Sequence, residues 1–292
     1  MADFPRTMVG GLSLPRLICG SNFGTHFSNA RNRFARQMNA CPSKMADCIE
    51  VFAKHGCNAF LSCPFKPVAD ALREVEQRTG QPMYWVATPW YAGSDLRRIL
   101  WDSPDLDDCW KRAVDETKAL GAHFCFPHMA MTDCLLDRIN RRLMPQMIRH
   151  LQYVREAGML PGLSTHTPQS IICADNTDEV VIDSYIQPYN AAGFLCEVAI
   201  ERAQQVIHHA HKPVMVIKPL ASGRLTPFAG LTFVWNTIRD CDMVTLGVMS
   251  PDEAEESIEI SLSILEKRRS ETTLPWSRSE ATIAAKPSAS TS

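Results

Sequence analysis

The sequence predicts a single (β/α)8 barrel, and three observations lead to this fold class. Short β-type runs alternate with longer helical stretches along most of the 292 residues. Eight such pairs can be counted, and repeated β-then-α units form parallel strands joined by right-handed crossovers. Eight units in roughly 250 residues match the size of a closed barrel. No Gly-x-Gly-x-x-Gly motif is present, which disfavours a doubly wound open sheet.

Apolar runs and glycines set the bounds of the expected elements. Gly56, Gly80, Gly121 and Gly158 close four of the helices, because glycine is common just after the last helical turn. Strands are expected at residues 15–20, 57–62, 83–88, 122–127, 159–164, 181–187, 213–218 and 242–247. Helices are expected at residues 44–55, 67–79, 104–119, 133–157, 196–210, 229–239 and 251–268, with a short helix after Pro168.

Two segments lie outside the repeat. Residues 21–43 form a long first connection from strand to helix, and such connections lie on the functional face of a barrel. From about Arg269 the chain is rich in Ser, Thr, Ala and Pro and has no apolar periodicity. We therefore expect one barrel domain over residues 1–268 and a disordered tail over residues 269–292.

The composition is typical of a globular protein and disfavours several function classes. The chain is 45% hydrophobic and 21% charged, with a net charge of −2, so no general attraction to nucleic acid or anionic lipid is expected. No apolar run approaches the roughly 18–20 residues that span a bilayer, and the start does not resemble a secretion signal. Eleven cysteines without a Cys-x-x-Cys pair indicate buried thiols. We expect a soluble cytoplasmic protein with a small-molecule ligand, and its oligomeric state is left open.

Polar residues just beyond the strand ends are the first candidates for chemistry in a barrel. His128 follows the fourth strand and could act as a general acid or base. His166 lies two residues past the fifth strand. Lys218 closes an apolar seventh strand, where partial desolvation suits a base, a Schiff-base amine or an anion-binding group. These three are the candidate catalytic residues.

Other polar and aromatic residues at the same strand ends are candidates for binding substrate. Amide and aromatic groups in the segment IQPYN suit a planar or polyhydroxylated ligand, although the amides could equally cap a loop. The candidate substrate-binding residues are Asn22, His26, Trp90, Tyr189 and Asn190. A divalent metal held by histidines and Asp133 is possible from the ligand types, but no short metal motif links them. No metal ligands are therefore assigned.

Several segments, taken in order, resemble the aldo-keto reductase superfamily. They are TMVGGLSLPRLICGSNFG, GCNAF, LSTHT, IQPYN, KPLASGRL and TLGVMSPDEAEESI. The resemblance implies a (β/α)8 TIM barrel with an N-terminal β-hairpin and a site at the carboxyl ends of the strands. It also implies a nicotinamide cofactor, with Ser164 and Gln187 holding the nicotinamide amide and Gly247 as a further cofactor contact.

The resemblance breaks at the catalytic residues. The family reduces carbonyls with an Asp, Tyr, Lys and His tetrad, and only the His has a counterpart here, His128. The positions of the other three fall in AFLSCPF (59–65) and ATPW (87–90), which lack them. Because carbonyl reduction needs a proton donor for the developing alkoxide, the implied active site is divergent.

The segment after the eighth strand bears on the cofactor. It carries Asp252, Glu253, Glu255 and Glu256, which would repel the 2′-phosphate of NADP. NADP is therefore disfavoured, and NAD is possible. The sequence favours a divergent reductase-like oxidoreductase acting on a small carbonyl or sugar-like substrate. A non-redox isomerase, epimerase or lyase, or a non-catalytic binding subunit, stays open on the same barrel, so whether the protein is an enzyme is undecided.

Overall fold

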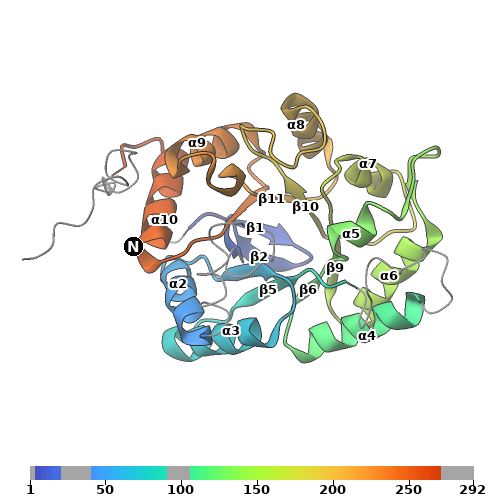
Figure 1. Cartoon of the computed structure of the whole chain (residues 1–292), viewed down its shortest axis with the longest axis horizontal. Coiled ribbons are helices and arrows are strands. Elements are labelled where there is room, and N and C mark those ends of the chain that lie inside the picture. The colour runs from blue at the N-terminus through green and yellow to red at the C-terminus, as the bar shows by residue number, and fades with distance from the viewer. Residues whose placement is uncertain (1–3, 21–40, 91–105, 271–292) are drawn as a thin grey trace, which may run out of the picture.

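The computed structural model describes residues 4–20, 41–90 and 106–270. Within them, eight parallel strands close into a barrel, which confirms the predicted fold class (Figure 1). The strands are β3 (Leu17–Gly20), β4 (Ala59–Ser62), β5 (Tyr84–Ala87), β6 (Phe124–Cys125), β9 (Leu160–Ser164), β10 (Ser184–Pro188), β11 (Val214–Ile217) and β12 (Met243–Leu246). The last strand, β12, pairs with the first, β3, and this pairing closes the ring.

An outer ring of helices surrounds the barrel (Figure 1). Its members are α2 (Pro42–Lys54), α3 (Lys66–Thr79), α4 (Leu106–Ala119), α6 (Pro145–Glu156), α7 (Gln169–Asp175), α8 (Ile200–His209), α9 (Pro227–Thr237) and α10 (Pro251–Leu265). Gly80 ends α3 in the left-handed conformation with φ of 69°, as its sequence position predicts. None of the helices in the described ranges is long and apolar enough to cross a membrane.

Alternation along the strands divides the core into two layers. Side chains at every second position fill the barrel interior, and those between them pack against the helices. The interior holds Ile18, Val86 and Phe124, among others. A hairpin of β1 (Arg6–Val9) and β2 (Leu12–Pro15) adds Val9 and Leu14 to this interior cluster.

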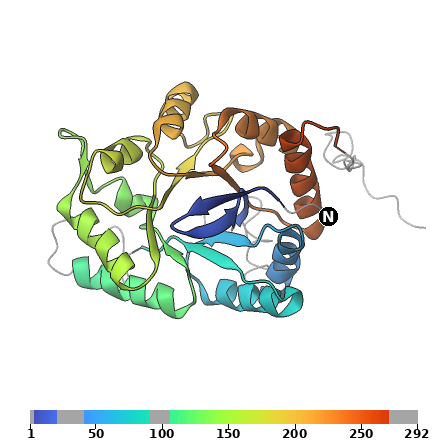
Figure 2. The same cartoon turned by 180° about the vertical axis from the view of Figure 1, so that it is seen from behind.

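The N-terminal β-hairpin is the one that the family resemblance implies, and it covers the end of the barrel at which the strands begin. Figure 2 shows it in the foreground, across the barrel opening. The opposite face, seen in Figure 1, is therefore the one at which the strands end.

One expected helix is wrong at its start. Residues 133–144 form no long helix; they follow the four-residue helix α5 (Met129–Thr132) and contain a small hairpin, β7 (Leu136–Asp137) and β8 (Arg142–Leu143). The carboxylate of Asp137 accepts the N–H groups of Ile139 and Asn140, which favours a turn over a helix. The helix α6 then begins at Pro145.

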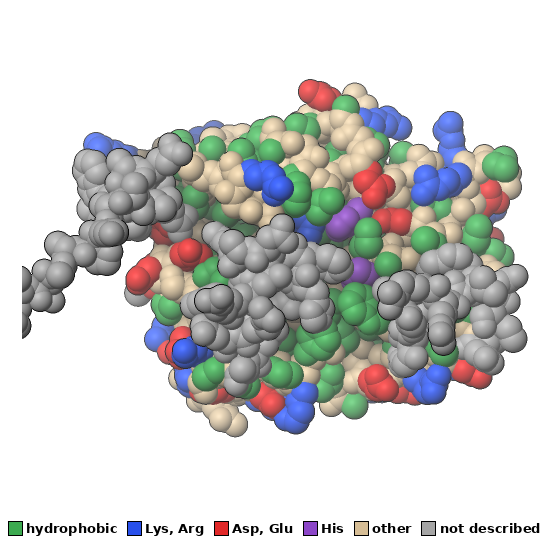
Figure 3. All heavy atoms as spheres, viewed as in Figure 1, with side chains coloured by type: hydrophobic (Ala, Val, Ile, Leu, Met, Phe, Trp, Pro, Cys, Tyr) green, Lys and Arg blue, Asp and Glu red, His purple; other side chains and the backbone are tan. Residues whose placement is uncertain are grey.

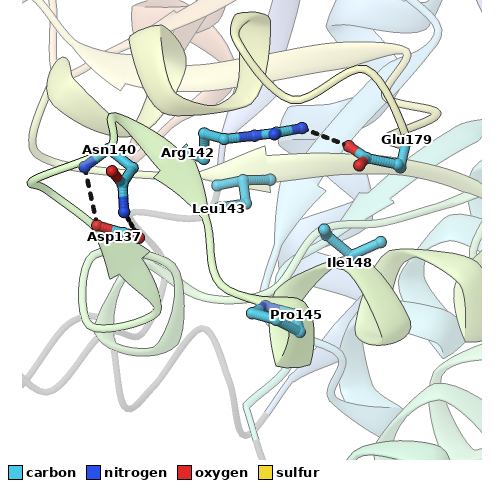
Figure 4. A pocket seen from close by; sticks show the side chains of 7 residues that line it. All are labelled: Asp137, Asn140, Arg142, Leu143, Pro145, Ile148 and Glu179. Atoms are coloured by element: carbon cyan, nitrogen blue, oxygen red, sulfur yellow. Dashed lines mark hydrogen bonds and ion pairs between the residues drawn. The ribbon is translucent and has the colours of Figure 1, made fainter.

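The same hairpin lines a cavity of about 580 Å³ on the side of the barrel. Figure 4 shows the Arg142–Glu179 ion pair, 2.7 Å long, on one side of it and the Asp137–Asn140 contact on the other. Its lining residues belong to the hairpin, to α6 and to the segment after α7, none of which follows the end of a barrel strand directly. We therefore look for the functional site at the strand ends and not in this cavity.

Candidate functional site

Three predicted catalytic residues follow three different strands at the same end of the barrel. His128 comes shortly after β6, His166 follows β9, and Lys218 follows β11. The positive charge of Lys218 lowers the pKa of both histidines, so all three groups lie within electrostatic reach of one another. Figure 3 shows histidine side chains near the centre of this face, beside acidic and basic groups.

His128 is held as a directed hydrogen-bond donor. It caps the N-terminus of α5, and its Nδ1 accepts the backbone N–H of Ala130 at 3.3 Å. Since a neutral imidazole carries one proton, that proton lies on Nε2, the nitrogen left for a ligand. The ring edge of His128 also meets the indole of Trp90, with ring centroids 4.8 Å apart at 83°. Trp90, a predicted substrate-binding residue, therefore lies beside the catalytic candidate.

Burial keeps both histidines neutral at pH 7. Burial first, and then the charge of Lys218, lower the pKa of His128 to about 4. The pKa of His166 is lowered to about 4 by burial first, then by Lys218 and by His128. The resting site thus holds two neutral imidazoles next to one cation.

Asp133 anchors the loop that carries His166. Its carboxylate accepts hydrogen bonds from the hydroxyl of Thr165, from the hydroxyl of Ser170 at 2.8 Å and from the backbone N–H of His166 at 2.9 Å. Burial raises the pKa of Asp133, and these three bonds oppose that rise. In the part of the chain that the structure describes, no group of three or more His, Cys, Asp or Glu side chains could hold a metal ion. The sequence named Asp133 only as a metal candidate and missed this anchoring role, for which it offers no signal.

Lys218 is a partly buried cation in an unusual backbone conformation. Its φ is 59°, in the left-handed region that non-glycine residues rarely adopt. Burial lowers the pKa of its ammonium group. Among the described residues, the ammonium has no hydrogen-bond or ion-pair partner.

Backbone strain is concentrated in the two loops that follow β10 and β11. Of the seven non-glycine residues with positive φ in the described ranges, five lie in these loops. They are Leu195, Glu197, Lys218, Ala221 and Ser222. The guanidinium of Arg224 lies 4.1 Å from the ring centroid of Phe194, which joins one loop to the other. Strain of this kind is typical of ligand-binding sites, and here it borders Lys218.

Two predicted substrate-binding residues lie in the protein core. Tyr189 is 1% exposed, belongs to the layer between barrel and helices, and packs against Phe233 with ring centroids 5.1 Å apart. The amide of Asn190 donates to the carbonyl of Phe194 and accepts its N–H, both at 2.9 Å, so it caps the loop after β10. The structure brings neither side chain to the three catalytic candidates. Asn22 and His26 lie outside the described residues.

The two residues of the predicted nicotinamide clamp, Ser164 and Gln187, face different sides of the sheet. Leu163 packs in the outer layer, so Ser164 faces the barrel interior. Ile186 belongs to the interior cluster, so Gln187 faces outwards. The Gln187 side chain is fully buried: its Nε2 donates to the carbonyl of His166 at 3.3 Å, and its Oε1 has no hydrogen-bond partner among the described residues. The clamp stays a prediction.

The loop after β12 and the start of α10 form a closed, acidic helix end. Ser250 accepts the N–H of Glu253 at 3.2 Å, and the carboxylate of Glu253 accepts the N–H of Met249 at 2.9 Å. This reciprocal capping uses backbone donors that could otherwise contact a phosphate. Asp252 and Glu253 also place negative charge in the first helical turn. Negative charge and occupied backbone donors are unfavourable surroundings for a phosphate, whereas Gly247, which follows β12, carries no charge.

Comparison with known proteins places the fold. No protein-family model matches the sequence, and no curated protein does either. A solved Pseudomonas aeruginosa structure described as an aldo-keto reductase is 16% identical, with 90% of this chain and 97% of that chain covered, at a TM-score of 0.62. The chain has the aldo-keto reductase barrel fold.

Two further solved structures agree with this fold. An aldo/keto reductase from Brucella melitensis is 12% identical, with 88% of this chain and 93% of that chain covered, at a TM-score of 0.57. An aldo-keto reductase enzyme from a Medee basin deep-sea metagenome library is 9% identical, with 91% and 96% covered, at a TM-score of 0.54. At such low identity the likeness concerns the fold, and the chemistry has to be argued from the residues.

Proposed function

We propose that this protein is an oxidoreductase of the aldo-keto reductase type that acts on a small carbonyl or sugar-like substrate. The observation that carries the proposal is His128, which follows the fourth strand of a reductase-type barrel and presents Nε2–H as a fixed donor. A donor aimed at a carbonyl oxygen stabilises the negative charge that develops there during reduction. His166 and Lys218 lie within electrostatic reach of the same point.

The proton donor differs from that of the family. The usual Tyr and Lys have no counterpart, so the proton for the alkoxide comes from His128, His166 or Lys218. These are the titratable groups that the described strand ends bring together. Catalysis by a proton donor of this kind contributes about 10²–10⁴-fold.

NADH fits the proposal better than NADPH. When bound, a nicotinamide supplies the hydride that carbonyl reduction requires. Ser164 and Gly247 would contact it, whereas Gln187 is committed to backbone carbonyls. The acidic start of α10 opposes the additional phosphate of NADPH.

A nucleotide titration tests the proposal. Purified protein is titrated with NADH and with NADPH while tryptophan and nucleotide fluorescence are followed. We expect NADH to bind and NADPH to bind more weakly, because the acidic helix end repels its 2′-phosphate. If neither binds at concentrations of about 1 mM, the protein is not an oxidoreductase of this type.

A second candidate is a non-redox isomerase, epimerase or lyase on the same site. The observation that favours it is the pair of imidazoles beside a lysine, since two bases and an acid suffice to move protons on a sugar-like ligand. Turnover of a sugar or hydroxycarbonyl substrate without added nucleotide would select this candidate. Nucleotide binding without any turnover would instead indicate a binding subunit.

A further inference from the structure

We propose that Lys218 is the receptor for a single carboxylate group on the substrate, held beside the Nε2–H of His128. The substrates would then be carbonyl compounds that carry one carboxylate. This inference deepens the proposed function and rests on it for the carbonyl chemistry. The anion site itself can be tested without any nucleotide.

The first argument is the state of the Lys218 ammonium. A charge withdrawn from water is costly unless it is paired. Other buried cations of this protein are paired: Arg16 donates to two backbone carbonyls at 2.9 and 3.0 Å, and Arg239 forms a 2.7 Å ion pair with Asp242. Lys218 acts electrostatically on both candidate histidines, and no hydrogen-bond or ion-pair partner for its ammonium occurs within the described ranges. An anionic ligand would supply the missing partner.

The second argument is the strained backbone conformation of Lys218 and of the residues that follow it. The left-handed conformation of Lys218 is followed by Ala221 and Ser222 in the same region. Such conformations are energetically unfavourable for non-glycine residues and occur most often at ligand-binding and active sites. The conformation also ends β11 abruptly, so the lysine stays at the strand end beside the two histidines.

The third argument selects a carboxylate over a phosphate. The neighbouring imidazoles are neutral, so the site offers one positive charge. A monoanion would match this single ammonium. A dianionic phosphate would keep one negative charge without a partner in a partly buried site, which is unfavourable. Lysine is also a point charge, without the fork of donors that an arginine offers to phosphate.

Binding of a carboxylate would change the two histidines. The positive charge of Lys218 lowers the pKa of His128 and of His166, so an anion that offsets this charge raises both. A raised pKa lets an imidazole take up a proton and later donate it to the alkoxide oxygen, which leaves neutral imidazole and a hydroxyl group. The carboxylate would thus bind more tightly as the pH falls from 7 towards 4.

Calorimetric titration of the nucleotide-free protein tests the receptor. The probe is oxamate, which carries one carboxylate next to a carbonyl; oxamide is its neutral counterpart, and inorganic sulfate is a dianion over the whole pH range. We expect oxamate to bind, the other two to bind at least tenfold more weakly, and Lys218→Met to weaken oxamate by about tenfold or more. Lys267→Met is the matched control, because Lys267 is an exposed lysine with φ of 55°.

The outcomes separate the two proposals. Absence of oxamate binding, equal binding by the wild type and Lys218→Met, or sulfate binding as tight as that of oxamate would each overturn the carboxylate receptor. Oxamate binding that depends on Lys218 in a protein that binds no NADH would support the receptor and reject the reductase. Circular dichroism melting curves verify that Lys218→Met is folded.

Imidazole NMR provides a second readout that loss of packing would not imitate. In the wild type, oxamate should raise the pKa of His128 and His166 above their resting values of about 4. Lys218→Met should raise both without any ligand. His150 is the internal control, because burial between α4 and α6 lowers its pKa without any contribution from Lys218. Unchanged values for His128 and His166 in both experiments would contradict the proposal.

Discussion

At the scale of single residues, the candidate site consists of neutral donors around one cation. His128 owes its tautomer to a bond with the backbone of Ala130, and His166 owes its place to Asp133. Neither arrangement requires a bound ligand. The site is therefore preorganised, which is the condition under which hydrogen-bond donors stabilise a developing charge most effectively.

Acidification should lower the free energy of unfolding, because the buried histidines cannot take up protons in the folded chain. The pKa of His128 is about 4 in the folded chain and about 6.5 when exposed, so the unfolded chain binds more protons between these values. The free energy of unfolding therefore falls as the pH drops from 6.5 towards 4. Urea denaturation at pH 7 and pH 5 measures this fall.

The variant His128→Asn isolates this contribution, because asparagine can still accept the Ala130 N–H at the helix cap. Its loss of stability between pH 7 and pH 5 should be smaller than that of the wild type by about 1–2 kcal/mol. An equal loss in both proteins would mean that His128 titrates normally in the folded chain.

Asp133 should matter for stability as well. In Asp133→Asn, an NH2 group replaces one of the oxygens that now accept from Thr165, Ser170 and His166, so at least one buried donor loses its acceptor. We expect a loss of about 1–3 kcal/mol in the free energy of unfolding, measured in urea at pH 7. The exposed Asp115→Asn is the control and should change it little. Equal stability of the two variants would show that the loop does not depend on this carboxylate.

At the scale of elements, the start of α10 is the part of the barrel from which we propose a preference for NADH over NADPH. The capping by Ser250 and Glu253 closes the helix end, and Asp252 adds charge to its first turn. Four of the five residues 252–256 are acidic. Their negative charge is the reason why we expect the 2′-phosphate of NADPH to bind poorly here.

Reversing one of these charges should shift the nucleotide preference. Asp252→Lys leaves the capping pair intact and supplies a partner for the 2′-phosphate, so the affinity for NADPH relative to NADH should rise about five- to tenfold. Fluorescence titration with both nucleotides measures the ratio. Glu116→Lys, an exposed change of the same charge on α4, should leave the ratio unaltered. No shift in Asp252→Lys would place the 2′-phosphate elsewhere.

At the scale of the whole molecule, the architecture could be predicted because it depends on patterns that repeat. Each strand is an apolar run, and Gly80 ends its helix as expected. The segment 133–144 could not be predicted, because its helical apolar spacing competes with the turn formed by the Asp137 carboxylate. That competition is settled by specific hydrogen bonds and not by hydrophobic period.

The sequence could predict at which end of the barrel the candidate residues lie, but not the surroundings of each side chain. Strand ends located His128, His166 and Lys218, because parallel strands end at one face. Which side of the sheet Gln187 faces, and whether Tyr189 is buried, depend on the register of the strand. A shift of one residue moves every side chain to the opposite side of the sheet, and the sequence does not determine the register that closely. The left-handed backbone of Lys218 has no sequence signal, since lysine rarely adopts it.

The N-terminal hairpin limits the directions from which a ligand can reach the candidate site. Val9 and Leu14 fill the end of the barrel at which the strands begin, and the interior above them is packed with side chains. Among the described residues, this packing leaves no route to Lys218 through the barrel from the hairpin side. Substrate and product would then both pass through the face at which the strands end, so product would have to leave before the next substrate could bind.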